Sequence, residues 1–180
     1  MQEVKNVSWL FLLMCLISPL SAQERTGLSD YPLGAGDKLY IQVFGEEELS
    51  LEVLLSDAGT ISYPFLGELQ AKGLTTGKLS QAITEGLSDG YLVSPSVSVT
   101  VLEYRQFFIY GQVAKPGGYP YQPGLTLQKA VALAEGFTER ASSNKFFLVR
   151  EGHTDKNAIS ANLQTAILPG DIVTIEESFF

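Results

Sequence analysis

The sequence predicts an α+β protein of two small modules, each built of mixed short strands with one helix. Three observations favour this class. Strand-forming segments outnumber helical ones, both helical segments open on the same Gly-Leu-Thr triplet, and Gly, Pro and Asp separate the strands at short intervals. With 180 residues, 45% of them hydrophobic, the chain has room for two small cores.

Composition excludes several function classes. The net charge of −8, from 12 Lys+Arg against 20 Asp+Glu, opposes a broad surface for nucleic acid or anionic lipid, because phosphate binding needs clustered cations. One Cys and one His exclude a disulfide framework and a Cys-based or His-rich metal centre. We therefore predict no metal, no cofactor and no nucleic-acid partner.

The first segment is predicted to be a targeting signal rather than part of the fold. An apolar run over residues 7–20 ends at a Pro-Leu pair followed by Ser and Ala, which is typical of a secretory signal peptide. We expect residues 1–22 to be removed and residues 23–30 to form a leader. An uncleaved membrane anchor is the alternative. Cys15 follows a Met rather than a small residue, so lipidation is not predicted.

The first module contains one helix among short strands. A strand is expected over 39–44, after a turn that ends at Asp37, and further short strands over 51–69 are interrupted by Gly and Pro. A helix capped by Thr75 or Thr76 is expected to run to about Ser88. Its inner face would present Leu79, Ile83 and Leu87. The alternating segment 96–101 is the clearest strand of the chain.

The second module follows the same plan. A strand over 107–113 is expected to end at the Lys-Pro-Gly-Gly of residues 115–118, and a helix follows over 126–135. The inner face of that helix would present Leu127, Ala130, Val131 and Ala134. Late strands are expected over 146–149 and 172–175.

Short motifs that each occur twice suggest where the modules divide. Gly-Leu-Thr opens both helices, and Gly36-Asp37 before one strand reappears as Gly170-Asp171 before another. We predict modules over residues 31–104 and 105–178. Chance reuse of turn chemistry is the alternative, because two short copies do not prove a repeat.

No catalytic constellation is found, and no catalytic residue is predicted. His153 lies in a polar loop with no nucleophile in its sequence neighbourhood, and the carboxylates of residues 46–48 are typical of a solvated loop. Asp37, Asp57 and Asp171 each stand beside Gly, where a short carboxylate commonly accepts hydrogen bonds from backbone N–H groups. The chain is therefore predicted not to be an enzyme.

Several motifs stand in a recognisable order. The first module contains G-A-G-D-K-L-Y-I-Q-V-F-G (34–45), D-A-G-T-I-S-Y-P-F-L-G (57–67) and Y-L-V-S-P-S-V-S-V-T-V (91–101). These resemble the periplasmic domain of bacterial polysaccharide-export proteins, the outer-membrane auxiliary family. The second contains F-F-I-Y-G-Q-V-A-K-P-G-G-Y (107–119), L-T-L-Q-K-A-V-A-L-A-E-G (125–136) and L-P-G-D-I-V-T-I (168–175). These resemble the soluble-ligand-binding β-grasp (SLBB) domain. One departure is Glu135, where the family usually has Gly.

The resemblance implies a non-enzymatic component of capsule or exopolysaccharide export, located in the periplasm and associated with the outer membrane. It implies a homo-oligomeric ring, an inner-membrane polysaccharide copolymerase and the polysaccharide as partners. Few residues follow Asp171, so we expect a separate outer-membrane barrel to open the membrane. The alternatives are a stand-alone periplasmic carbohydrate-binding module and a small secreted glycan-active enzyme.

Four tyrosines are candidates for sugar contact. An aromatic ring with a polar tip suits the apolar faces and hydroxyls of a carbohydrate. The candidates gather near the domain junction and the turn at residues 115–118: Tyr104, Tyr110, Tyr119 and Tyr121. Core packing is the competing interpretation of these rings, and we favour it for residues 107–110.

The signal-peptide interpretation predicts a mature chain that begins at Gln23. N-terminal sequencing of protein recovered from the periplasm should return Gln23 as the first residue, because cleavage is expected after the small residue Ala22. Recovery of intact Met1 would favour the membrane-anchor alternative.

Overall fold

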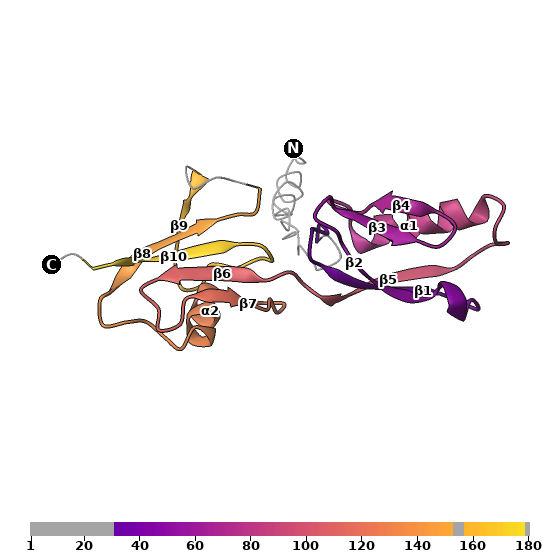
Figure 1. Ribbon diagram of the computed structural model, residues 1–180. Helices are drawn as coiled ribbons and strands as arrows, with labels where there is room; N and C mark the ends of the chain where they lie inside the picture. Colours follow the sequence, from indigo (N-terminus) through magenta and orange to yellow (C-terminus); the bar gives the residue numbers. More distant parts are fainter. Residues whose placement is uncertain (1–30, 153–156, 179–180) are drawn as a thin grey trace, which may run out of the picture.

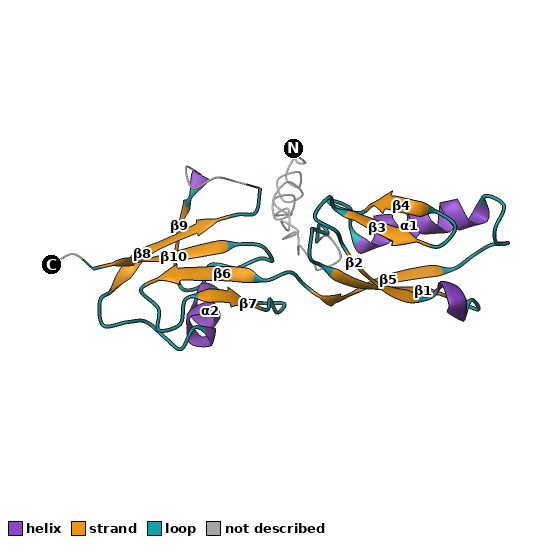
Figure 2. Ribbon diagram, viewed as in Figure 1, coloured by secondary structure: helices purple, strands orange, loops and turns teal. Residues whose placement is uncertain are grey.

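The computed structural model describes residues 31–152 and 157–178 (Figure 1). The predicted signal peptide, the leader and His153 lie outside this part of the chain. The α+β class is confirmed: two modules, each with one α-helix, lie end to end and are joined through residues 104–106 (Figure 2).

The N-terminal module combines a three-stranded antiparallel sheet with a hairpin and a helix. The sheet has the order β2-β1-β5, and β3 pairs with β4. The elements are β1 (Lys38–Val43), η2 (Glu47–Leu49, a 3-10 turn), β2 (Leu51–Leu54), β3 (Thr60–Tyr63), β4 (Gly67–Gln70), α1 (Thr76–Ser88) and β5 (Val97–Glu103). In β1 the buried residues alternate with exposed or half-buried ones, as expected for a sheet with one face on a core.

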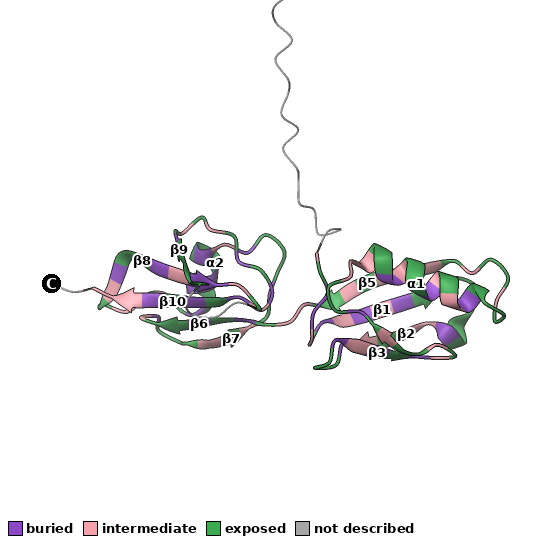
Figure 3. Ribbon diagram, turned by 90° about the horizontal axis from the view of Figure 1, so that it is seen from above, coloured by how far each residue is buried: buried purple, intermediate pink, exposed green. Residues whose placement is uncertain are grey.

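Helix α1 covers the inner face of this sheet. The Thr75 hydroxyl accepts a hydrogen bond from the backbone N–H of Lys78 at 3.3 Å, so the predicted cap is confirmed. The predicted inner face is also confirmed, since Leu79, Ile83 and Leu87 are fully buried. Figure 3 shows this buried stripe and the exposed opposite side of α1.

The C-terminal module is a five-stranded sheet with a short helix. Its strand order is β7-β6-β10-β8-β9. The elements are β6 (Phe107–Gly111), β7 (Gly117–Tyr119), α2 (Leu127–Leu133), β8 (Ala141–Val149), β9 (Ile159–Ala161) and β10 (Ile172–Glu177). The first strand, β6, and the last, β10, run parallel as neighbours near the centre of the sheet, and the other pairs are antiparallel. A core built from β6, α2, β8 and β10 is separate from that of the N-terminal module.

Three local expectations for this module need correction. Gly117 does not end a strand but begins β7, which pairs with β6. Strand β9 was not expected. Strand β8 begins at Ala141 rather than at residue 146, and its polar first half was missed because it lacks the alternation that marks a strand. Helix α2 ends at Leu133 because Glu135 adopts a left-handed backbone, with φ of 64°.

The central strand pair tolerates no side chain at Gly111. Its φ is 85°, and a Cβ built there would lie 2.1 Å from the carbonyl oxygen of Ile175 in β10. Gly111→Ala should therefore lower the free energy of unfolding by about 2 kcal/mol or more, measured by urea denaturation.

Gly45→Ala is the matched control for this prediction. Gly45 has a φ of 87° but no atom within 4 Å of a built Cβ, so only the backbone cost of about 1–2 kcal/mol applies. Equal losses in the two variants would contradict the steric argument.

Candidate functional site at the domain junction

The first side of the junction is the turn that ends at Asp37. The backbone N–H of Asp37 donates to the carbonyl of Gly34 at 3.1 Å, and its Oδ2 accepts from the N–H of Gly34 at 2.8 Å. Gly36, with φ of 90°, makes the turn possible. The Asp37 side chain is fully buried.

The second side is an equivalent turn that ends at Asp171. The backbone N–H of Asp171 donates to the carbonyl of Leu168 at 3.2 Å, and its Oδ2 accepts from the N–H of Leu168 at 2.7 Å. Gly170 has a φ of 81°, and the Asp171 side chain is buried. The two Gly-Asp motifs therefore form the same kind of turn. The prediction that Asp37 and Asp171 accept hydrogen bonds from backbone N–H groups is confirmed.

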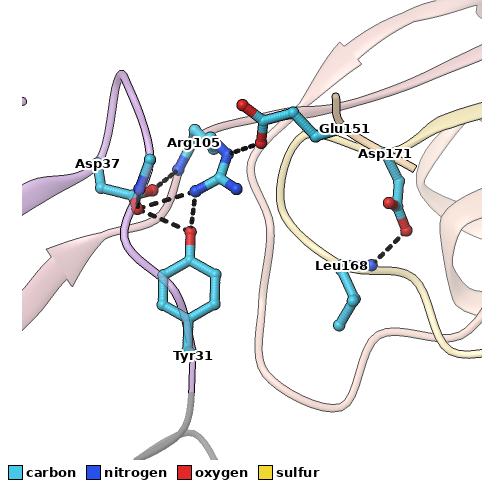
Figure 4. A network of polar contacts seen from close by, with 7 residues as sticks. Tyr31, Asp37, Arg105, Glu151, Leu168 and Asp171 are labelled. Carbon is cyan, nitrogen blue, oxygen red and sulfur yellow. Dashed lines mark hydrogen bonds and ion pairs between the residues drawn. The ribbon is translucent and has the colours of Figure 1, made fainter. Parts of the chain in front are cut away.

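Arg105 lies between these two turns and bonds to both modules (Figure 4). Its backbone N–H donates to Asp37 Oδ1 and its Nη1 to Asp37 Oδ2, both at 2.9 Å. Nη1 also donates to the hydroxyl of Tyr31, and Nε donates to Oε2 of Glu151, just after β8. One side chain thus ties the start of β1 to the C-terminal module.

The backbone of both turns makes room for this guanidinium. A Cβ built on Gly34 would lie 2.4 Å from Arg105 Nη1. One built on Gly170 would lie 2.4 Å from Glu151 Oε2 and 3.0 Å from Arg105 Nε. A larger residue at either position would displace the arginine. The two glycines therefore leave the space in which the guanidinium lies close to the backbone of both modules.

Aromatic rings continue the contact across the junction. Tyr104 lies edge-on to Tyr31, with ring centroids 5.1 Å apart, and edge-on to Tyr121 at 5.3 Å. The guanidinium carbon of Arg105 lies 5.4 Å from the centroid of Tyr31. Tyr104 also packs against the core of the C-terminal module. The junction therefore joins an ion pair to an apolar contact.

Burial shapes the titration of these groups. It raises the pKa of the Tyr31 hydroxyl, and the hydrogen bond that this hydroxyl donates to Asp37 Oδ2 at 2.7 Å raises it further. Burial also raises the pKa of Asp171, although the N–H of Leu168 and the guanidinium of Arg150 oppose that effect. The Tyr31 hydroxyl thus acts as a hydrogen-bond donor to a buried carboxylate.

The four candidate tyrosines are divided by the structure. Tyr104 and the buried Tyr121 meet at the junction. Tyr119 stacks on Phe107 and donates its hydroxyl to the carbonyl of Lys115 at 2.7 Å. Tyr110 is 44% exposed on the outward side of β6. The structure thus brings together only two of the four, and sugar contact by any of them stays a prediction.

Sequence reasoning missed Arg105. Its partners Tyr31, Asp37 and Glu151 are 74, 68 and 46 residues away, so no local pattern reveals them. The available signal was a single cation in a short linker, together with two repeated Gly-Asp turns that could meet there.

The arrangement is suited to bracing the two modules against each other. Removing one partner of a buried ion pair costs about 3–5 kcal/mol, because the other charge is left unpaired.

Within residues 31–152 and 157–178, no group of three His, Cys, Asp or Glu side chains could hold a metal ion. None of the helices described there has the length and apolar character to cross a bilayer.

Comparison with known families defines the class of both modules. Residues 26–102 match the family described as "Polysaccharide biosynthesis/export protein", and residues 106–157 match the SLBB domain. The chain thus contains a polysaccharide-export domain followed by an SLBB domain, and the resemblance inferred from its motifs is confirmed.

Two curated relatives extend across both modules. The "Exopolysaccharide production protein ExoF" of Rhizobium meliloti (strain 1021) is 31% identical over 150 residues, which cover 76% of this chain and 36% of the relative. The "EPS I polysaccharide export outer membrane protein EpsA" of Ralstonia nicotianae (strain ATCC BAA-1114 / GMI1000) is 26% identical over 195 residues, covering 89% of this chain and 50% of the relative. The chain spans about half or less of the length of these relatives.

The raised pKa of Tyr31 predicts a specific alkaline response. A group whose pKa is higher in the folded state stabilises the fold below its unfolded pKa, here about 10, and this contribution is lost as pH rises further. Tyr31→Phe should be less stable than wild type at pH 8, because it loses the hydrogen bond to Asp37. The difference in unfolding free energy should shrink above about pH 10. A difference that stays constant through this window would contradict the assignment.

Proposed function

We propose that the chain is a non-enzymatic component of a polysaccharide export system, in which it forms or docks a periplasmic conduit to the outer membrane. The observation that supports this most is the ordered pair of a polysaccharide-export domain and an SLBB domain in one chain. The names of both relatives, an exopolysaccharide production protein and a polysaccharide export outer membrane protein, point to the same process.

The junction suits a subunit that works in many copies. A head-to-tail ring closes only when every subunit presents its two contact surfaces at the same angle. The Asp37–Arg105–Glu151 contacts fix the angle between the modules through a buried carboxylate and a mostly covered guanidinium. We therefore propose a homo-oligomeric ring whose subunit contacts involve both modules.

The proposed partners follow from this role. They are the polysaccharide, an inner-membrane polysaccharide copolymerase and a separate outer-membrane barrel, with the chain in the periplasm beside the outer membrane. A stand-alone carbohydrate-binding module is the alternative function. The two differ in solution mass, since only the conduit requires a multimer under light scattering.

Export measured in cells tests the proposal. Deletion of the gene should lower the polysaccharide recovered outside the cells and raise the amount retained within them. Restoring the wild-type gene should reverse both changes. Unchanged secretion in the deletion strain would refute the proposed function.

A junction variant tests the bracing role within that function. Arg105→Ala removes the contacts with Asp37 and Glu151 and should reduce secretion severalfold, since the modules are no longer held at one angle. Secretion by Arg105→Lys should lie between that of Arg105→Ala and that of wild type, because an ammonium group cannot make all the hydrogen bonds of the planar guanidinium.

The matched control is Lys115→Ala, which removes an ion pair of similar length with Glu135 at 2.5 Å that lies exposed within one module. Its secretion should equal that of wild type. Periplasmic protein levels measured by immunoblot separate a defect in export from simple loss of the protein. A defect of equal size in both variants would contradict the bracing role.

A further inference from the structure

The outer face of the N-terminal sheet presents an unusual row of side chains. Tyr40 and Gln42 occupy alternate positions of β1, so they share the face opposite the core. Phe44, in the turn that follows β1, lies beside them. Helix α1 covers the inner face of the same sheet. Phe44 is 57% exposed, and Gln42 is exposed as well. An amide thus stands between two aromatic rings on an accessible surface.

The row lines a hollow with a volume of about 780 Å³. Glu47 and Glu48 of η2 line the same hollow. The hollow is preformed, because Ser50 holds η2 against the end of β1. Its hydroxyl accepts from the backbone N–H of Val43 at 2.9 Å and donates to the carbonyl of Glu46 at 3.1 Å. A volume of this size falls in the range of small-ligand sites.

The polar groups of this hollow are available to a ligand. Among the described residues, the side chains of Tyr40 and Gln42 make no hydrogen bond, and those of Glu47 and Glu48 form no ion pair. A pyranose ring has one face of C–H groups and a rim of hydroxyls. An aromatic ring covers the face, while amide and carboxylate groups bond to the rim.

We propose that this hollow is a binding site for a segment of polysaccharide that is neutral in charge. The inference rests on the proposed function, which supplies the ligand, and it identifies where the chain would hold that ligand. Glu47 and Glu48 accept hydrogen bonds from sugar hydroxyls but repel uronic acids and acidic substituents at close range. The charge of −8 on the whole chain acts in the same direction.

The same composition argues against a protein partner on this face. The centre of a protein interface is depleted in charged residues and forms a contiguous apolar patch. Here Gln42 interrupts the aromatic row, and two carboxylates close the hollow. This alternation of ring and polar group suits a ligand that itself alternates C–H faces with hydroxyls.

Binding to fractionated oligosaccharides tests the proposal. The probe is the exopolysaccharide secreted by the source strain, partially hydrolysed and separated into neutral and acidic oligosaccharides. Titration calorimetry with the purified mature chain should detect binding of the neutral fraction. Phe44→Ala should weaken that binding by about tenfold, and Gln42→Ala by about threefold, since each removes one contact of the row.

The matched control is Tyr91→Ala. Tyr91 is an exposed aromatic residue of the same module, 51% exposed and stacked on Phe65, and it does not line the hollow. Its affinity for the neutral fraction should equal that of wild type. All three substitutions lie on the surface. Unfolding curves of the variants should match that of wild type, which would show that their folds are the same.

Each other outcome overturns the proposal in a distinct way. Wild-type affinity in Phe44→Ala would remove the hollow as the site, and binding of the acidic fraction alone would refute the ligand class. Absence of binding to both fractions would refute sugar recognition by this chain. A change of solution mass in Phe44→Ala without a change in sugar affinity would reassign the face to a subunit contact. Secretion by the deletion strain decides the proposed function independently of these results.

Discussion

The contact between Asp37 and Arg105 is the constraint on which the arrangement of the modules depends. The carboxylate is fully buried, so it needs a partner, and within the described residues its oxygens receive N–H groups of Gly34 and Arg105 together with the Tyr31 hydroxyl. Because that arginine belongs to the linker, satisfying a buried charge of the first module also fixes where the second module begins. The linker is thereby part of the first core's polar chemistry.

The junction also separates mechanical roles within one cluster. The aromatic contacts of Tyr104 are apolar and weakly directional, so they resist separation of the modules but not rotation. The guanidinium is planar and bonds in fixed directions, so it resists rotation. Neither contact alone would hold both the distance and the angle between the two sheets.

Local chemistry could be predicted from the sequence, and long-range pairing could not. Thr75 caps α1 as expected, because capping depends on residues three positions apart. Thr126, which was expected to begin the second helix, caps α2 in the same way. The buried stripe of α1 follows directly from its apolar period. Arg105 was missed because its partners converge only after both modules fold. The aromatic row of β1 was missed as well, because the alternation fixes which residues share a face but not that η2 would close a hollow beside them.

The parallel pairing of β6 with β10 determines the order in which the chain can fold. The N-terminal module has every strand of its sheet once residue 103 has emerged, and Arg105, which completes the hydrogen bonding of Asp37, follows two residues later. The C-terminal module lacks a strand near the centre of its sheet until residues 172–177 arrive, because β10 joins β6 to β8. As the chain emerges from its N-terminus, the first module can therefore fold while β6 and β8 of the second module are not yet joined. In that interval the apolar inner faces of β6 and β8, which belong to the core of the folded module, are open to solvent and to other chains.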